Sequence, residues 1–296
     1  MKTTMSKLTI LITGATGFLG SALLKSLIGQ FEVIAIVRST SKLDRIEEVL
    51  QKIKCYNIDE IPLNVIFEEN KIDLIVHCAT NYGRGKPFLT EIVQANLILP
   101  LHLLQLASLY KIKGFVNTDT ILDNRINLYS LSKKQFLEWL RHFSQDFICI
   151  NVALEHFYGP FDNSSKFVTW SIRNLLDKVQ SIDLTEGKQK RDFIYIDDVV
   201  QAFLRIIDFT LKTSHGFWEF EVGSDERVEI RHFVELAKEL SENSETLLNF
   251  GALPYRENEV MESRANTESL RNLGWQPTIS LKTGLLKTIE SEKKGL

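Results

Sequence analysis

The sequence is poor in cysteine, with three in 296 residues, Cys55, Cys78 and Cys149. An odd and small number argues against a disulfide framework, and no zinc-ligand spacing is present. The six histidines form neither an HExxH nor an HxxxH pattern, so we expect no metal. Cys78 and Cys149 each lie in an apolar run, which predicts buried thiols without a chemical role.

The sequence also lacks an excess of positive charge, because 35 Lys and Arg residues face 38 Asp and Glu residues. This balance predicts no nucleic-acid partner and no membrane surface. The apolar run at 8–12 is too short for a signal peptide core, and the apolar-rich stretch at 92–110 is interrupted by polar residues. We interpret that stretch as a buried helix and expect a cytoplasmic protein.

Short apolar runs alternate with helical patterns through the first half of the chain. A hydrophobic share of 44% is enough for a large core. Alternating elements with nearly continuous apolar strands predict an α/β fold, a doubly wound parallel sheet covered by helices on both faces. The expected strands are 8–12, 32–37, 74–78, 114–117 and 147–152, and the expected helices are 19–27, 43–51, 91–110 and 132–143.

The second half of the chain is less regular. It carries turn signals near residues 159–165 and 186–187, and a further strand and helix are expected over 193–206. Another strand is expected at 217–222, with helices at 229–240 and near 281–290. We therefore predict two domains: a dinucleotide-binding domain of residues 1–152 plus about 192–208, and a smaller, interleaved substrate domain of residues 153–191 and 209–296.

A GxxGxxG spacing joins the first expected strand to the first expected helix. Gly14 permits a tight turn, Gly17 lets a pyrophosphate approach the backbone, and Gly20 lets the helix and strand pack closely. The alternative is a glycine-rich turn without a ligand, but the strand–turn–helix context is the one that a Rossmann-type dinucleotide site requires. The predicted cofactor contacts in this turn are Gly14, Thr16, Gly17, Phe18 and Leu19.

The end of the second expected strand bears on the choice of cofactor. NAD enzymes usually place an acid there for the ribose 2′-hydroxyl, whereas this chain has Arg38 followed by Ser39. A cation at this position favours the 2′-phosphate of NADP(H), and both residues are predicted to bind it. The alternative is a solvated surface arginine, and NAD remains the alternative cofactor.

Tyr129 and Lys133 are spaced as YxxxK at the start of an expected helix, so they share one face. An ammonium near a phenol is expected to lower the pKa of Tyr129 toward neutrality, which suits carbonyl–alcohol chemistry. Thr118 leaves the preceding strand and offers a hydroxyl to the reacting oxygen. The spacing alone is common on helix surfaces, and it gains weight from its place after a predicted strand.

These features together resemble the extended short-chain dehydrogenase/reductase family, also called the NAD-dependent epimerase/dehydratase family. The resemblance covers nearly the whole chain. The segment Arg191–Val199 is close to the RDFIYVDDV segment that marks nucleotide-sugar epimerases, dehydratases and reductases. Further matches are the glycine spacing, 77–80, Asn96, Thr118, the YxxxK pair, 157–160 and 273–277.

The resemblance implies a role for each matching residue. Thr118, Tyr129 and Lys133 would be catalytic, and Lys133 would also bind the nicotinamide ribose. Arg191 would bind the substrate diphosphate, with a structural ion pair to Asp192 or Asp197 as the alternative. The resemblance further implies cofactor contacts at Ala79, Thr80 and Asn96, and substrate contacts at Asp119, His156 and Arg256.

Two of these substrate contacts have plainer alternatives. His156 would be a packed histidine beside Glu155, and Arg256 a merely exposed arginine. Two departures from the family pattern also bear on the pocket: Thr118 and Tyr129 are separated by fewer residues than is usual, and Ala153 replaces an arginine.

Within the family, four segments resemble reductases that act on the 4-keto group of a CDP-activated 3,6-dideoxyhexose. They are 118–119, 155–160, 187–191 and 258–261. The resemblance implies an NADPH-dependent reductase of a nucleotide-diphosphate 4-keto-deoxysugar, in deoxysugar and O-antigen biosynthesis. It also implies a homodimer formed through the helices at 96–110 and 132–143.

Two other functions remain open. One is an NAD-dependent epimerase or dehydratase, and the other is a non-catalytic dinucleotide-binding regulatory protein. Dehydratases of the family follow the catalytic threonine with an Asp-Glu pair, whereas here Asp119 is followed by Thr120, so the base is missing.

Overall fold

The computed structural model describes residues 7–85 and 87–294. The chain divides into two compact units, Met1–Ala153 with Phe203–Phe220, and Leu154–Ala202 with Glu221–Leu296. The first boundary between the units falls within two residues of the predicted domain boundary. The later segment that belongs to the first unit differs, because it comprises residues 203–220 where 192–208 had been expected.

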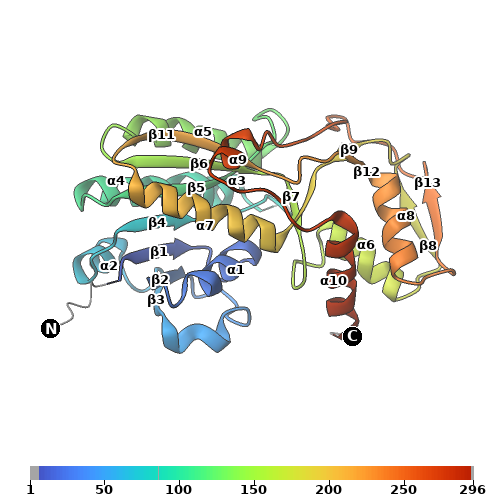
Figure 1. The fold of residues 1–296 in the computed structure, drawn as a ribbon, viewed down its shortest axis with the longest axis horizontal. Coiled ribbons are helices and arrows are strands. Elements are labelled where there is room, and N and C mark those ends of the chain that lie inside the picture. The colour runs from blue at the N-terminus through green and yellow to red at the C-terminus, as the bar shows by residue number, and fades with distance from the viewer. Residues whose placement is uncertain (1–6, 86, 295–296) are drawn as a thin grey trace. The chain divides into compact units, whose positions relative to one another are not determined.

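A seven-stranded sheet forms the centre of the first unit, in the order β11-β6-β5-β4-β1-β2-β3 (Figure 1). Strand β1 pairs in parallel with both β2 and β4, and the pairs β2–β3 and β4–β5 are also parallel. The α/β doubly wound fold is confirmed. The strands are β1 Thr9–Thr13, β2 Glu32–Val37, β3 Lys54–Asn57, β4 Leu74–His77, β5 Gly114–Thr120, β6 Ile148–Leu154 and β11 Gly216–Val222.

The chain order reverses on the two sides of β1. Strands β2 and β3 lie on one side of it, and β4, β5, β6 and β11 lie on the other. Ligands of open α/β sheets bind at such a switch point, beyond the carboxyl ends of the strands. A ligand is therefore expected beyond the carboxyl ends of β1 and β4, where the glycine turn follows β1.

Helices cover the sheet because its strands are apolar on both faces. All seven residues of β5 are buried, and Phe115 packs with Ile75 and Cys149 in one core cluster. Cys149 is buried as predicted, Cys78 is partly buried and Cys55 is exposed. The covering helices are α1 Phe18–Leu27, α2 Leu63–Glu69, α3 Leu89–Val93, a π-helical turn Gln94–Ile98, α4 Leu99–Leu109 and α5 Leu128–Phe143.

Two expected helices differ from the structure. The stretch expected at 43–51 forms only a 3₁₀ helix, Glu47–Lys52, with no buried side chain. The stretch expected to be a buried helix spans Leu89–Leu109, and only 33% of its most apolar window is buried. By length and composition alone this helix could cross a membrane, a test that core helices of soluble proteins also pass. Leu103, Leu104 and Ala107 of this helix are buried in the core cluster, whereas Leu89 and Leu109 are exposed.

The second unit is built around three helices, α6 Phe167–Leu176, α8 Ile230–Leu240 and α10 Leu281–Lys294. Phe193 and Phe233 stack with their ring centroids 4.3 Å apart, and Trp275 donates to the Asp198 carbonyl at 3.1 Å. Helix α7, Ile196–Lys212, begins in this unit and ends in the first. The remaining elements are β7 His156–Tyr158, β8 Ser181–Leu184, β9 Lys190–Arg191, β10 Phe193–Tyr195, β12 Val228–Glu229, β13 Leu247–Phe250 and α9 Glu268–Asn272.

Candidate active site

The strand register brings the predicted site residues of the first unit to one edge. Thr13 pairs with His77, and His77 pairs with Asn117, so β1 and β4 end level with Asn117 of β5, and β5 continues to Thr120. The residues that follow these strands therefore meet beyond one edge of the sheet. The glycine turn follows β1, Ala79 and Thr80 follow β4, and Thr118 lies one position beyond Asn117.

The glycine turn has the geometry that the spacing predicts. Gly14 has φ +64°, and a Cβ at this position would lie 2.6 Å from the backbone nitrogen of Ala79. A Cβ at Gly20 would lie 2.1 Å from the Gly14 carbonyl oxygen, so α1 packs directly on the turn. Gly17 precedes α1, and no described side chain caps the helix there. A helix N-terminus without a side-chain cap is the kind of position at which a pyrophosphate binds.

An arginine that the sequence analysis did not select also contacts this turn. The Arg45 guanidinium donates to the Thr16 carbonyl oxygen at 3.2 Å. Arg45 precedes the 3₁₀ helix by two positions, and no local pattern connects it to a turn 29 residues earlier. It adds a cation beside the turn where a pyrophosphate is predicted to bind.

Arg38 and Ser39 lie in an exposed turn directly after β2. The Arg38 amide donates to the Ser41 hydroxyl at 3.0 Å, and none of the described residues pairs with the Arg38 guanidinium. The Ser39 amide donates to the Asp59 carboxylate at 2.8 Å. The end of β2 therefore presents the Arg38 guanidinium to a ligand. It also lies next to the Asp59 carboxylate, which was not expected there from the sequence.

A chain of hydrogen bonds connects β1, β4 and β5 at the edge. The Thr13 hydroxyl lies 2.8 Å from Nδ1 of His77 and accepts from the Ala79 amide at 3.1 Å. The Thr118 hydroxyl donates to the His77 carbonyl oxygen at 3.0 Å. Burial lowers the pKa of His77 well below its usual value, and the charge of Lys133 acts in the same direction. His77 is thus a neutral, structural member of the edge.

Asn96 lies in the π-helical turn, completely buried. Its side-chain oxygen accepts from the Thr80 hydroxyl at 3.2 Å and the Asn81 amide at 2.7 Å. Its amide nitrogen donates to the Asn81 carbonyl and the Ser132 hydroxyl, both at 2.9 Å. The predicted direct cofactor contact does not fit this geometry. Asn96 instead holds the loop after β4 against α5.

Tyr129 is the second residue of α5 and packs against Tyr82, with ring centroids 5.0 Å apart. Burial raises the pKa of Tyr129 well above 10. The charges of Tyr82 and Asp119 raise it further, and a hydrogen bond with Thr120 lowers it. The predicted lowering of this pKa is therefore wrong for the protein on its own. The phenol is protonated at neutral pH, as a proton donor must be.

The Lys133 ammonium is buried and has no hydrogen-bond partner among the described residues. Burial lowers the pKa of Lys133 to about 8, and the charges of Asp119 and Cys78 oppose this shift. An unpaired buried ammonium is costly, and such groups in native proteins usually mark a missing partner. Lys133 is therefore placed as expected for a residue that binds a hydroxyl-bearing ligand.

Asp119 is fully enclosed by its neighbours. One carboxylate oxygen accepts from the Lys134 ammonium at 2.8 Å and from the Asn151 amide at 3.0 Å. The other accepts from the Thr120 amide at 2.7 Å. The Asp119 side chain has no exposed surface, so the predicted contact with substrate does not fit this geometry. Lys134 and Asn151 were missed in the sequence, because their partner lies 15 and 32 positions away.

Arg191 in the second unit is 8% exposed and paired with the Glu259 carboxylate. Its guanidinium also donates to the Lys190 carbonyl at 2.9 Å. Burial lowers the pKa of Arg191, and Arg256 acts in the same direction, so two cations lie close enough to interact. Neither acid proposed as a structural partner is used, because Asp192 accepts from Ser224 and Asp197 faces Lys287 at 3.8 Å.

His156 pairs with Glu155, Nδ1 to carboxylate oxygen, at 2.9 Å. Glu155 is buried and also accepts from the Ser263 hydroxyl, whereas the His156 side chain is 45% exposed. The packed residue of this pair is therefore Glu155, whereas the His156 side chain is partly exposed. The imidazole keeps an exposed side that a ligand can reach.

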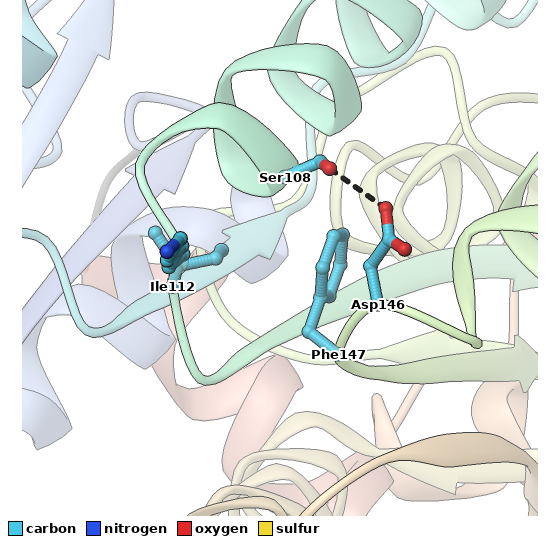
Figure 2. Close-up of a pocket in the computed structure, with 5 residues that line it drawn as sticks. Ser108, Ile112, Asp146 and Phe147 are labelled. Atoms are coloured by element: carbon cyan, nitrogen blue, oxygen red, sulfur yellow. Dashed lines mark hydrogen bonds between the residues drawn. The ribbon is translucent and has the colours of Figure 1, made fainter.

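A hollow elsewhere on the first unit has no catalytic chemistry. It lies where α4 ends and before β5 and β6 begin, at the edge opposite the glycine turn (Figure 2). The Ser108 hydroxyl donates to the Asp146 carboxylate at 2.7 Å, and Phe147 and Ile112 form its apolar wall. Its one carboxylate is already paired, so we assign no site there.

Comparison with known proteins agrees with this geometry. Residues 10–220 match the model of the NAD dependent epimerase/dehydratase family. The chain belongs to this family. It is therefore an NAD(P)-dependent enzyme, and the resemblance inferred from its motifs is confirmed.

The family relatives include two CDP-abequose synthases. That of Salmonella muenchen is 34% identical over 96% of this chain and 98% of its own length. That of Salmonella typhimurium is 35% identical over 93% of this chain and 95% of its own length. Among solved structures, UDP-glucose 4-epimerase from Thermotoga maritima superposes with a TM-score of 0.85 at 22% identity, covering 97% of this chain and 99% of that one.

The residues at the edge fit the nicotinamide dinucleotide of the family. Added Cβ atoms would fill the turn at Gly14 and Gly20, α1 begins without a side-chain cap, and Lys133 has a buried ammonium to donate. Within residues 7–85 and 87–294, no cluster of three or more His, Cys, Asp or Glu side chains could hold a metal ion.

Proposed function

We propose that the protein is an NADPH-dependent reductase of the C4 keto group of a nucleotide-activated deoxyhexose. The reaction type is the conversion of CDP-4-dehydro-3,6-dideoxy-D-glucose to CDP-abequose, a cytoplasmic step of deoxysugar and O-antigen biosynthesis. The observation that carries the proposal is the buried, unpartnered Lys133 ammonium one helical turn from Tyr129 on α5, together with the enclosure of Asp119, the acid that follows Thr118. The similarity to two CDP-abequose synthases over nearly the whole chain supports the same substrate class.

The proposed chemistry uses Tyr129 as the proton donor. NADPH, when bound, supplies two electrons and a hydrogen to the carbonyl carbon and becomes NADP⁺. Tyr129 gives its phenolic proton to the carbonyl oxygen as negative charge develops, which completes the alcohol. The Thr118 hydroxyl turns from the His77 carbonyl to the same oxygen. The Lys133 ammonium offsets the charge left on the phenolate and donates to the nicotinamide ribose.

The proposed cofactor contacts follow the edge of the sheet. The turn from Gly14 to Leu19 and the N-terminus of α1 receive the pyrophosphate, and Arg45 adds a cation there. Arg38 and Ser39 receive the 2′-phosphate, and Ala79 and Thr80 line the nicotinamide side. In the second unit, Arg191 exchanges Glu259 for the substrate diphosphate, with Arg256 as a second cation and His156 toward the sugar.

One observation favours a second candidate, an NAD-dependent epimerase. Asp59 places a carboxylate at the end of β2, held by the Ser39 amide. An acid at this strand end is typical of NAD enzymes. Tyr129, Thr118 and Lys133 would serve an epimerase equally well, so the two candidates differ in whether cofactor is consumed.

A substrate panel tests the proposed function. Purified protein with NADPH is offered CDP-, dTDP-, UDP- and GDP-linked 4-keto-deoxy sugars, and the product sugar is identified by NMR. We expect a new C4 alcohol from the CDP sugar. Tyr129→Phe is the matched control and should lower turnover by about 10²–10⁴-fold while NADPH still binds. The proposal fails if no keto sugar is reduced, or if the phenylalanine variant turns over like the wild type.

A further inference from the structure

Lys134 connects helix α5 to the end of β5. Its ammonium donates to the Asp119 carboxylate at 2.8 Å and to the Thr120 carbonyl at 2.7 Å. It is the neighbour of Lys133 on α5, so the two ammonium groups leave the helix about 100° apart. One lysine is committed to Asp119, and the other has no hydrogen-bond partner among the described residues.

Asp119 is held from a second strand as well. The side-chain nitrogen Nδ2 of Asn151 on β6 donates to the same carboxylate oxygen at 3.0 Å, and the side-chain oxygen Oδ1 of Asn151 accepts from Nδ2 of Asn117 at 2.8 Å. A buried carboxylate that lost its cation would keep its desolvation cost without the compensating attraction. Lys134 is thus the group that keeps Asp119 in this place as an anion.

The charge of Asp119 acts on both members of the proposed catalytic pair. It adds to burial and Tyr82 in raising the pKa of Tyr129, and it opposes the burial that lowers the pKa of Lys133. Lys134 itself lowers the pKa of Lys133. The other charged or titratable groups around the cluster are Cys78 and His77 at the end of β4, Asp123 after β5, and the Arg141–Glu219 pair next to Asn151.

We propose that Lys134 is a positioning residue of the active site. It holds Asp119 away from substrate as a fixed negative charge near Lys133, which lies one helical turn from Tyr129 on α5. Asp119 then takes no part as an acid toward the sugar, although it occupies the position that follows the catalytic threonine. This inference rests on the proposed function only in naming Tyr129 and Lys133 as the catalytic pair.

Two substitutions should move the titration of Lys133 in the same direction. Asp119→Asn removes the negative charge, so Lys133 should lose its proton more easily and titrate at lower pH. Lys134→Met leaves Asp119 without the cation that keeps it in place as an anion, so Lys133 should again titrate at lower pH. Each shift should be on the order of one pH unit. A Lys134 that acted on Lys133 only through its own positive charge would instead raise the pH at which Lys133 titrates when it is removed.

The experiment follows lysine protonation directly in the cofactor-free protein. Lysine is isotope-labelled at Cε, and its NMR shift is followed from neutral to alkaline pH, with Lys133→Met assigning the signal. Wild type should titrate near a pKa of about 8. Lys134→Arg should match wild type because the charge is retained. Lys212→Met, which removes the exposed Lys212–Asp208 pair, is the control and should also leave the titration of Lys133 unchanged.

A higher titration pH of Lys133 in Lys134→Met, or no shift in either variant, would overturn the proposal. So would a Lys134→Arg protein that behaves like Lys134→Met. If Lys134→Met does not fold, the fall in Asp119→Asn and the unchanged titration of Lys134→Arg decide the question. Because no substrate is used, the expected shifts in a protein that reduces no keto sugar would contradict the proposed function and leave this inference standing.

Discussion

Single side chains at the sheet edge differ in whether their partners are already present. The Thr118 hydroxyl is bonded to His77, and the Asp119 carboxylate is bonded to Lys134 and Asn151. Three atoms at this edge are buried without a hydrogen-bond partner among the described residues: the Lys133 ammonium, Nε2 of His77 and Oδ1 of Asn117. Lys133 is the charged one of the three, and a buried charge without a partner is the costliest to leave so. It is therefore the group that is best placed to meet a ligand.

The side chain of Arg38 is predicted to set the preference between NADPH and NADH. Arg38→Asp should reverse the preference for NADPH over NADH, because the exposed guanidinium is lost and a carboxylate repels the 2′-phosphate. A charge-assisted contact contributes about 1.5–3 kcal/mol, so the ratio of kcat/KM values should fall roughly ten- to hundred-fold. Lys42→Asp makes the same charge change four residues later and serves as the control.

The measurement is kcat/KM for both cofactors in the wild type and both variants. A wild type that prefers NADH, or an Arg38→Asp protein with an unchanged ratio, would remove Arg38 from the site and favour Asp59 as an NAD-type acid. An equal change in Lys42→Asp would mean that general surface charge sets the preference.

Residue roles were predictable where local geometry decides them. The spacing of Gly14 and Gly20 needs only a strand, a turn and a helix, and the close approaches found there follow from it. The roles of Asn96 and Asp119 depend on partners that folding brings from 36 and 15 positions away, Ser132 and Lys134. No local pattern carries that information, so the sequence did not reveal these contacts within the protein.

At the scale of elements, strands with continuous apolar runs were predictable and short polar ones were not. Strands β2 and β4 match their expected ranges closely, because parallel strands are buried on both faces. Strand β3, with the sequence KCYN, has no buried residue and was missed. Helix α5 begins at Leu128 rather than at the expected 132, because Asn127 and Ser130 form a capping box.

Helices α4 and α5 bear on the proposed homodimer. Exposed apolar side chains follow α5 at helical spacing, with Leu131 at 38% and Trp139 at 49% exposure, and Leu109 at the end of α4 is 70% exposed. An apolar stripe on two adjacent helices is expected to pack against a second copy. We propose a homodimer through these helices.

Trp139→Glu should therefore break the dimer, because it places a charge in the centre of the contact. Sedimentation velocity should give twice the 34.0 kDa chain mass for wild type and a single chain mass for the variant. Trp218→Glu is the matched control, since Trp218 on β11 is similarly exposed at 44%. A monomeric wild type, or dissociation of the control instead, would contradict the assignment of α4 and α5.

At the scale of the whole molecule, the two units divide the proposed work. The first carries the turn, Tyr129 and Lys133, and the second carries the Arg191–Glu259 pair and Arg256. Residues 203–220 return to the first unit because β11 joins its sheet at the edge next to β6. The pairing of β11 with β6 joins residues that are far apart in the sequence. The sequence pattern alone therefore led to a different boundary.

A reductase consumes its cofactor, whereas an epimerase recycles it. Nicotinamide absorbance and sugar composition are therefore followed together while a CDP-linked 4-keto-deoxyhexose is converted. We expect one NADPH to be oxidised for each keto sugar consumed. We also expect no 4-keto product from a plain nucleotide-linked hexose, because Asp119 is enclosed and Thr120 cannot act as a base. Conversion of the sugar at constant nicotinamide absorbance would contradict the reductase and support the epimerase.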